Sequence, residues 1–466
     1  MQSTRRQALR TIAAAAATAV ASGPAVTWAS SGDVSRTVER DVVVIGGGSS
    51  GTYTAVRLRD LGKSVLVVER KDRLGGHCDT YTDPATGLTT DIGVIDFHDI
   101  PVVRDYFGRF GVPLVTEDIT STGTTAFADF RTGRTVQGYV PPVPTALGTY
   151  YGILQQYPYL ATGWDLPDPV PAELLQPFGD FVAANNLGSI VQLAFEFGQG
   201  FFNDILTLPT VYILKYFGLD VVGSILGNSF LTTPDHDNFR LYEQAGAFLG
   251  QDVLLDSSVI AASRNSDGVQ LLVDTPSGLV NVKASKLVIT APPLPGALAP
   301  FGLDATELSL FGRFQHANYY AALLNLPGVS NDLTVQNVAP ETAYNLPPLP
   351  ATYAITASNI PGLFAAWLGT PQTLCDADAQ ALIVNAIDRL QAAGTLPATH
   401  PSFVDFANHS PCELTVSATD IAGGFYSSLY ALQGHRNTFW NGAAFHVHDS
   451  SLLWRYTETV LPQIAA

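Results

Sequence analysis

The stretch Asp41–Asp79 decides how the rest of the chain is interpreted, and it reads DVVVIGGGSSGTYTAVRLRDLGKSVLVVERKDRLGGHCD. It begins with an unbroken apolar run, Val42 to Ile45, of the kind that a strand buried on both faces needs. Gly46, Gly48 and Gly51 follow at once in the spacing GxGxxG. In such a loop the first glycine makes a tight turn, the second lets the backbone approach a pyrophosphate, and the third lets a helix pack closely on the strand.

The residues after the glycines predict a helix over 50–61 and a second buried strand over 64–68. The phosphates are expected on the first amides of that helix, beside Ser49 and Ser50. The second strand ends at Glu69, whose carboxylate can accept hydrogen bonds from both hydroxyls of a ribose. A free 2′-hydroxyl is thereby implied, which disfavours NADP. The order of strand, glycine turn, helix and strand predicts a dinucleotide-binding unit.

A second glycine segment, Arg73-Leu74-Gly75-Gly76-His77, indicates that the dinucleotide is FAD and not NAD. It resembles the R-x-G-G-R segment of the flavin-containing amine oxidase superfamily and of glutathione-reductase-like flavoproteins, with a histidine in place of the closing arginine. In those families the segment wraps around the pyrophosphate on the flavin side. The resemblance implies FAD and an α/β fold, in which a GxGxxG Rossmann-like FAD-binding domain carries an inserted α+β substrate domain.

Two further phrases, TYTDPATG over 80–87 and DIGVIDFHD over 91–99, make the chain look like one subgroup of that superfamily. This subgroup contains secreted oxidoreductases related to β-cyclopiazonate dehydrogenase, and bacterial polyenoic fatty acid isomerases are more distantly similar. The resemblance covers roughly the first hundred residues after the leader and the last thirty. Between these parts it is architectural only.

By this resemblance, the residues expected to bind FAD come from several separate segments. They are Gly46, Gly48, Ser49, Ser50, Gly51, Glu69, Arg70, Arg73, Gly75, Gly76, His77, Gly93, Val94, Ile95, Val259, Ala291, Trp440, Gly442, Ala443 and Ala444. A last helix is expected to begin near 449–450, with its N-terminus stabilising the negative charge of a reduced flavin. His77 and Cys78 lie where a covalent link to the flavin could form, but non-covalent FAD is expected.

His98 is the candidate catalytic residue, because a histidine near the reacting face of the flavin could act as acid or base. A purely structural, hydrogen-bonded histidine is the alternative. His446 and His448 lack an acidic or cysteine partner at ligand spacing, so no metal is expected. Many amine oxidases carry a lysine on the strand that matches 311–325. No lysine follows Lys286, so the resemblance does not by itself imply amine-oxidase chemistry.

The first 31 residues predict an export signal, with the pair Arg5-Arg6 followed by the apolar run Thr11 to Ala21. A twin-arginine leader suits a protein that must fold around FAD in the cytoplasm. Ala8 replaces the usual phenylalanine, so ordinary secretion and a retained anchor remain alternatives. Cleavage could follow Ala21 or Ala29, and the mature protein is expected outside the cytoplasm, without stable membrane insertion.

The remaining chain is too long for one core, and two domains are expected. The ranges 36–105, 233–300 and 408–466 are assigned to a discontinuous FAD-binding domain. The ranges 106–232 and 301–407 are assigned to the substrate domain. Within these, short strands are predicted over 252–255, 258–263, 269–275, 279–283 and 286–290, a strand over 311–325, and a scaffold helix over 376–393.

Composition limits the partners. The chain has 41 acidic against 24 basic residues, a net charge of -17, which speaks against nucleic acid or an anionic membrane. Its only cysteines are Cys78, Cys375 and Cys412, so no disulfide framework is expected, and one bond between Cys375 and Cys412 is left open. The aromatic residues of 106–231 predict a cavity for a bulky apolar or aromatic molecule.

These features together predict a secreted FAD-dependent oxidoreductase that oxidises such a molecule by hydride transfer to the flavin, with O2 as a candidate acceptor. A redox-neutral double-bond isomerase of a polyunsaturated lipid is the first alternative. A flavin-containing binding protein without turnover is the second. The sequence does not indicate an oligomeric state.

Overall fold

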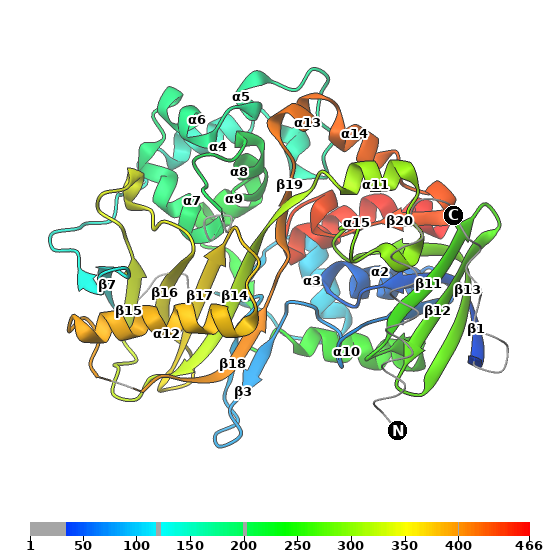
Figure 1. Ribbon diagram of the computed structural model, residues 1–466, viewed down its shortest axis with the longest axis horizontal. Helices are drawn as coiled ribbons and strands as arrows, with labels where there is room; N and C mark the ends of the chain where they lie inside the picture. Colours follow the sequence, from blue (N-terminus) through cyan, green and yellow to red (C-terminus); the bar gives the residue numbers. More distant parts are fainter. Residues whose placement is uncertain (1–33, 118–122, 199–202, 399) are drawn as a thin grey trace.

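The computed structural model describes residues 34–117, 123–198, 203–398 and 400–466. The expected export signal, residues 1–31, lies outside these ranges. Two large sheets organise the described part of the chain, one of seven strands and one of eight. Figure 1 shows the two sheets next to each other, with helices over both.

The seven-stranded sheet contains the strands around the GxGxxG turn, in the order β10-β2-β1-β13-β12-β11, with β20 beside β13. Its strands are β1 (Val34–Ile45), β2 (Val65–Val68), β10 (Val253–Leu254), β11 (Ser258–Asn265), β12 (Gly268–Thr275), β13 (Gly278–Ile289) and β20 (Thr438–Trp440). β1 pairs in parallel with both β2 and β13, and β13 pairs in parallel with β20. The valines at 42–44 and 65–68 are buried, as expected for parallel strands covered on both faces.

The helices α2 (Ser49–Asp60), α10 (Arg240–Leu249) and α15 (Ser450–Ala465) accompany this sheet, and both α10 and α15 pack on α2. The prediction of two strands over 279–283 and 286–290 is wrong, because β13 runs without a break. Its register with β1 continues from Leu279 to Ile289, and no turn residue separates Lys283 from Lys286. β1 is long enough to pair with β13 over its whole length, so the two predicted segments form one strand.

The eight-stranded sheet has the order β18-β14-β17-β16-β15-β7-β8, with β19 beside β14. Its strands are β7 (Thr124–Asp129), β8 (Arg134–Thr135), β14 (Gln315–Asn325), β15 (Leu333–Asn337), β16 (Ala351–Ala357), β17 (Leu363–Thr370), β18 (Ser402–Asn408) and β19 (Cys412–Thr415). The strand predicted over 311–325 begins only at Gln315, because α11 (Ala305–Phe311) occupies the residues before it. α12 (Asp376–Ala392) packs on β16 and β17, close to its predicted bounds.

The aromatic-rich segment forms short helices, which Figure 1 shows above the eight-stranded sheet. They are α4 (Leu147–Leu154), α5 (Ala172–Leu175), α6 (Phe178–Ala184), α7 (Val191–Gly198), α8 (Thr210–Tyr216) and α9 (Leu219–Gly227). No single described helix is long and apolar enough to cross a membrane; only the bent pair α8 and α9 passes that test together. Most of the α8 side chains are buried inside the protein, which suits a core helix equally well.

Smaller elements join these parts. β5 (Phe97–His98), β9 (Phe230–Thr232) and β6 (Val115–Thr116) form a three-stranded sheet, and β3 (Thr80–Thr82) pairs with β4 (Thr89–Asp91). The remaining helices are α3 (Pro101–Arg109), α13 (Ala418–Ala422) and α14 (Phe425–Tyr430). β19 lies inside the range 408–466 that the sequence assigns to the nucleotide domain, yet it pairs with β14 of the other sheet. The domain boundaries therefore stay a prediction.

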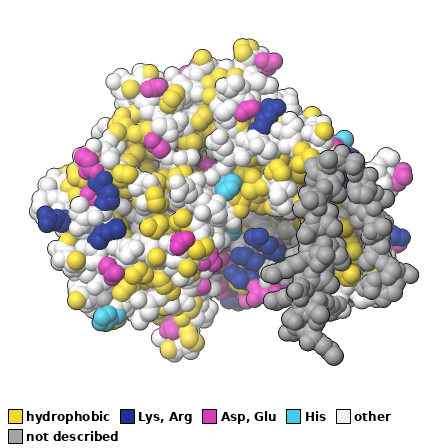
Figure 2. All heavy atoms as spheres, viewed as in Figure 1, with side chains coloured by type: hydrophobic (Ala, Val, Ile, Leu, Met, Phe, Trp, Pro, Cys, Tyr) yellow, Lys and Arg dark blue, Asp and Glu magenta, His cyan; other side chains and the backbone are white. Residues whose placement is uncertain are grey.

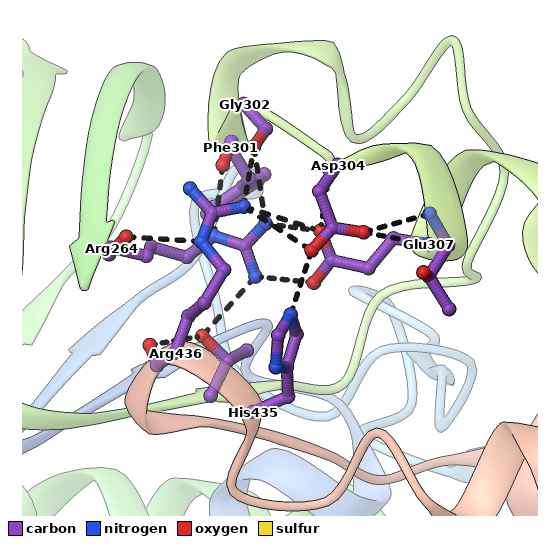
Figure 3. Close-up of polar contacts among 9 residues, drawn as sticks. Arg264, Phe301, Gly302, Asp304, Glu307, His435 and Arg436 are labelled. Carbon is purple, nitrogen blue, oxygen red and sulfur yellow. Dashed lines mark hydrogen bonds and ion pairs between the residues drawn. The ribbon is translucent and has the colours of Figure 1, made fainter. Parts of the chain in front are cut away.

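A buried ion pair fixes the position of β20 (Figure 3). The guanidinium of Arg264 on β11 and the carboxylate of Glu307 on α11 are both 0% exposed, and they lie 2.7 Å apart. Arg264 also donates to Phe301 O at 2.8 Å and to the hydroxyl of Thr438 at 3.2 Å. Arg436 donates to the backbone of Arg264 at 3.0 Å. The segment that leads into β20 is thus held against β11 and α11.

The cysteines are all free, with Cys375 exposed and Cys78 and Cys412 buried. The Cys375–Cys412 bond that the sequence leaves open is therefore not formed. Figure 2 shows a recess on one face of the molecule in which basic side chains gather, while apolar side chains are scattered around it. Charged residues make up only 14% of the chain, so uncharged side chains cover most of this face.

Candidate functional site

The glycine turn has the close contacts that its spacing predicts. Gly46 has φ +97°, which favours glycine, and a Cβ on Gly51 would lie 1.8 Å from the carbonyl oxygen of Gly46. Gly48 is the N-cap of α2 and makes no side-chain cap hydrogen bond, and no acidic residue lies in the first turn. The first amides of α2 are therefore left for an anion, as a dinucleotide pyrophosphate requires.

The second glycine segment lies directly on the first. A Cβ on Gly76 would come within 2.8 Å of Gly48 Cα, and Gly76 has φ +63°. Gly75 donates its backbone N–H to Gly47 O at 2.8 Å. A third segment closes on this pair, because a Cβ on Gly93 would lie 1.8 Å from His77 O. We call these three glycine segments, 46–51, 75–77 and 93–95, the cradle.

Glu69 lies at the end of β2, where the sequence places it. Its carboxylate is buried and accepts from Gly47 N at 2.6 Å and from Lys71 N at 2.7 Å. Each oxygen of a carboxylate can accept more than one hydrogen bond, so acceptor capacity remains for a ribose. Among the other predicted residues, Arg73 pairs with Asp79, Arg70 is exposed, and Val259 and Ala291 are half-buried.

His77 follows the two glycines of the second glycine segment. Its side chain is accessible, yet burial by surrounding protein, helped by Lys71 and Arg70, lowers its pKa to about 4. The ring stacks on His409 at 4.4 Å with an interplanar angle of 1°. Both imidazoles are neutral, because burial also lowers the pKa of His409 well below its usual range.

The third predicted element follows β20. The Trp440 side chain is fully buried and packs at 4.8 Å against Phe311, so it offers a ligand no side-chain surface. Gly442 has φ +112°, and a Cβ there would lie 3.0 Å from Thr290 O. Ala443 keeps accessible surface and Ala444 is buried. The segment therefore approaches the end of β13 closely, which leaves its backbone and Ala443 to face a cofactor.

His98 does not have the free ring nitrogen that the predicted acid–base role requires. Its side chain is 2% exposed, with Nδ1 2.9 Å from Ser224 Oγ and Nε2 3.1 Å from Asp449 Oδ2. Burial opposes the charge of this imidazole, but Asp449 raises its pKa above the ordinary value. Asp449 is the N-cap of α15 and accepts from Leu452 N at 2.9 Å. The geometry therefore favours a positioning role for His98.

A pocket borders Ala443, and we call it the aromatic pocket. Its lining residues come from α8, β19, the loop before α5 and the segment 443–448: Trp164, Tyr212, Lys215, Tyr216, Glu413, Leu414, Ala443, His446, Val447 and His448. Tyr216 stacks on His448 at 4.2 Å, and His448 Nδ1 lies 2.5 Å from Glu413 Oε2. Glu413 has φ +38°, a conformation that costs a non-glycine residue energy and is frequent at functional sites.

Lys215 is a site residue that the sequence argument missed. It lies on α8, is 5% exposed, and its Nζ contacts Leu160 O at 2.9 Å, Gly163 O at 2.5 Å and His446 Nδ1 at 2.9 Å. All three donors of an ammonium group are therefore engaged, and none is left to hold a water molecule beside a cofactor. A single charge inside the apolar run TVYILKYFG is the signal that could have drawn attention to it.

These residues fit FAD. The cradle leaves space that only glycines allow, the N-terminus of α2 is uncapped by any side chain, and a buried carboxylate lies at the end of β2 beside the glycine turn. Gly93–Asp96, Ala443 and 448–450 keep accessible surface. In the described part of the chain, no group of three or more His, Cys, Asp and Glu side chains is placed to hold a metal ion.

Comparisons with known proteins agree with this arrangement. Residues 44–110 match the family described as NAD(P)-binding Rossmann-like domain. The FAD-dependent oxidoreductase oblC of Cochliobolus heterostrophus is 41% identical over 447 residues, which cover 92% of each chain. The β-cyclopiazonate dehydrogenase of Aspergillus oryzae is 37% identical over 440 residues, 93% of this chain and 95% of that enzyme.

A solved structure shares the fold across both sheets. The fatty acid isomerase of P. acnes that produces CLA superimposes with a TM-score of 0.71 over 91% of this chain and 98% of its own, at 18% identity. This likeness concerns the fold alone. It confirms the predicted α/β class, and the sequence relatives confirm the predicted resemblance. The chain belongs to the family of FAD-dependent oxidoreductases that includes β-cyclopiazonate dehydrogenase.

Proposed function

We propose that this enzyme oxidises a bulky apolar or aromatic small molecule, with the hydride passing from the substrate to FAD. The support for this proposal is the lining of the aromatic pocket, in which Trp164, Tyr212 and Tyr216 lie with Ala443 of the third cofactor segment; the pocket has room for about one water molecule in this structure, so a bulky ligand would enter only after side chains move. Aromatic walls next to a cofactor suit a flat, apolar ligand, and the polar lining residues Lys215, Glu413, His446 and His448 would fix its orientation.

The residues that would hold the cofactor are those of the cradle, Glu69 and the segment 442–444. When bound, FAD supplies the acceptor for two electrons. The chain's own part is binding, orientation and exclusion of water. The uncapped N-terminus of α2 would bind the phosphates, Glu69 would bind the ribose, and the N-terminus of α15, capped by Asp449, would stabilise negative charge on the ring.

The named activities of the relatives support net oxidation, since the chain's similarity to a dehydrogenase extends over 93% of its length. We take O2 or a diffusible oxidant as the final acceptor, because the proposed export removes the enzyme from the nicotinamide pools of the cytoplasm. Export itself rests on Arg5-Arg6 and the apolar run after them. N-terminal sequencing of the secreted protein tests it, with Ala21 and Ala29 as the expected cleavage sites.

A redox-neutral isomerase is the second candidate function. Two observations favour it: the fold is shared with a fatty acid isomerase, and the Nζ of Lys215 is engaged by three partners, so this lysine is not free to assist the reaction with oxygen. In such an enzyme the hydride returns to another carbon of the same substrate. A polyunsaturated lipid would then be the substrate.

The pocket assignment is tested with a panel of terpenoids, aromatic alkaloids and polyunsaturated fatty acids. Tyr216→Ala should raise KM for a turned-over compound at least tenfold, because the ring forms one wall of the pocket. Tyr81→Ala, in the β3–β4 hairpin, is the matched control and should leave KM unchanged. Equal effects of the two variants would contradict the assignment of the pocket.

A further inference from the structure

A histidine–glutamate pair lines the aromatic pocket. The Nδ1 atom of His448 lies 2.5 Å from Oε2 of Glu413, and both residues belong to the lining of that pocket. The ring of Tyr216 stacks on the imidazole at 4.2 Å with an interplanar angle of 14°, so the imidazole is held on one face as well as at Nδ1. The side chains of His448 and Glu413 are 16% and 11% exposed, so the pair is not sealed in the core.

The pair lies where the eight-stranded sheet meets the third cofactor segment. Glu413 is on β19, which pairs with β14 of that sheet and packs against the turn Ala443–Phe445. His448 follows this turn and directly precedes Asp449, the N-cap of α15. Ala443 lines the same pocket as the pair. Contact, chain position and pocket lining therefore all place His448 beside the segment proposed to face the cofactor.

The partner of Nδ1 determines which nitrogen of His448 is basic. An ionised carboxylate only accepts hydrogen bonds, so Nδ1 of His448 carries a hydrogen and donates it to Glu413. In the neutral imidazole the lone pair is then on Nε2. When Nε2 takes a proton, the new positive charge lies beside the Glu413 carboxylate, which stabilises it. The pair is therefore arranged as a base of fixed orientation.

The other nitrogen groups of the pocket lining are less suited to accept a proton. Nδ1 of His446 receives the N–H of Gly163 at 3.2 Å and lies 2.9 Å from Nζ of Lys215, so this imidazole carries its hydrogen on Nε2. Burial, followed by the charge of Lys215, lowers the pKa of His446 well below its ordinary value, so the ring stays neutral. Nζ of Lys215 is itself engaged by three partners.

We propose that His448 is the base of the oxidation and that Glu413 positions it. Loss of a hydride removes two electrons and one hydrogen from the substrate, and a second hydrogen must leave as a proton before the new double bond can form. The hydride goes to FAD and the proton to Nε2 of His448, which becomes an imidazolium paired with the Glu413 carboxylate, so atoms, electrons and charge balance.

This inference rests on the proposed oxidation, and it narrows the substrate class. A base in the pocket is needed only for a substrate that loses a proton. The substrate therefore carries an acidic hydrogen, on oxygen, nitrogen or an activated carbon, next to the carbon that loses the hydride.

The first experiment needs no turnover and locates the hydrogen on His448. Long-range proton–nitrogen correlation spectra of FAD-loaded protein with isotope-labelled histidine distinguish the two ring nitrogens, and His448→Gln identifies the signals of His448 by their loss. The neutral ring in the wild type should carry its hydrogen on Nδ1, because Glu413 accepts it. Hydrogen on Nε2 alone overturns the proposal.

The second experiment measures the rate of flavin bleaching by a turned-over compound in the absence of oxygen. His448→Gln should lower the maximal rate about a hundredfold, while the substrate concentration that gives half of that rate changes less than about threefold. Glu413→Gln should lower the rate by a smaller factor, because the imidazole stays in place but its counter-charge is lost. A fall of less than about threefold in His448→Gln contradicts the role of His448.

Added ring compounds separate proton transfer from packing. In His448→Ala, free imidazole should raise the bleaching rate at least about tenfold. Pyrazole has the same size and is a much weaker base, so it should give little recovery. Equal recovery with the two compounds would show that the ring of His448 only fills space, and would contradict its assignment as the base.

His435→Gln is the matched control. His435 also contacts a carboxylate, that of Asp304 at 2.7 Å, but its side chain is 43% exposed, so the bleaching rate should equal that of the wild type. FAD content and the melting temperature show that each variant is folded and loaded. If no compound bleaches the wild-type flavin, the proposed oxidation fails, while the position of the hydrogen on His448 still decides whether its Nε2 is the basic nitrogen.

Discussion

The Nε2 atom of His98 lies 3.1 Å from Oδ2 of Asp449, and Asp449 accepts the N–H of Leu452 at the start of α15. His98 also donates its backbone N–H to Ser451 Oγ at 3.0 Å. β5 and the N-terminus of α15 are therefore joined at two points. This link holds the N-terminus of α15, the helix end proposed to face the flavin, against β5.

Replacement of His98 by Asn should destabilise the protein in a pH-dependent way. The folded-state pKa of His98 is raised by Asp449, so the ion pair contributes stability that is fully present below about pH 6.5 and is lost as pH rises through the folded pKa. Removing one partner of a buried pair costs about 3–5 kcal/mol at low pH. Urea unfolding of wild type and variant from pH 5 to 9 should show the two curves converging as pH rises.

His435→Asn is the control for that experiment. His435 lies 2.7 Å from Asp304 with 43% of its side chain exposed, so its loss should cost at most about 1 kcal/mol. A similar loss of stability in both variants, or a His98→Asn effect that grows with pH, would contradict the role assigned to the buried pair.

Gly51→Ala should abolish FAD binding. The new Cβ would lie 1.8 Å from the carbonyl oxygen of Gly46, so α2 cannot approach β1 without moving the loop that holds the phosphates. The measurement is FAD content after purification and after reconstitution with excess FAD. Gly108→Ala, on α3 with no atom within 4 Å of its new Cβ, should keep full FAD content. Normal FAD content in Gly51→Ala would refute the assigned turn.

Local sequence patterns were enough to predict the first βαβ unit, its cofactor and the helix of the last segment. Glycine spacing and short apolar runs are properties of neighbouring residues, so they can be recognised in the sequence without knowledge of the structure. The role of His98 could not be predicted from the sequence, because its partners Ser224 and Asp449 are distant along the chain. Lys215 was missed for the same reason, because its three partners come from other segments of the chain.

Glu307→Gln should destabilise the protein by about 3–5 kcal/mol, because it leaves the buried guanidinium of Arg264 without its counter-charge. The chemical-denaturation midpoint should fall while the spectrum of bound FAD is retained under native conditions. Glu39→Gln is the control, because its partner Lys283 is 52% exposed and lies 3.7 Å away. A change in Glu307→Gln no larger than in the control would show that the buried pair does not stabilise β20.

Acid precipitation should release FAD from the polypeptide. The Cys78 thiol is buried and burial raises its pKa well above the ordinary value, so little thiolate is available for a bond to the flavin. His77 is accessible but stacks on His409, and non-covalent binding is expected for it too. Flavin fluorescence that remains with the denatured chain would contradict this, and His77→Ala would then identify the linked residue.

Net oxidation is tested most directly by mixing FAD-loaded enzyme with a candidate substrate in the absence of oxygen and recording the flavin band. The proposed function predicts that the band bleaches by one equivalent of substrate per flavin and recovers when O2 or another acceptor is added. Product should not exceed the enzyme concentration before that addition. Many turnovers without any acceptor, with little lasting bleaching, would contradict net oxidation and identify the enzyme as an isomerase.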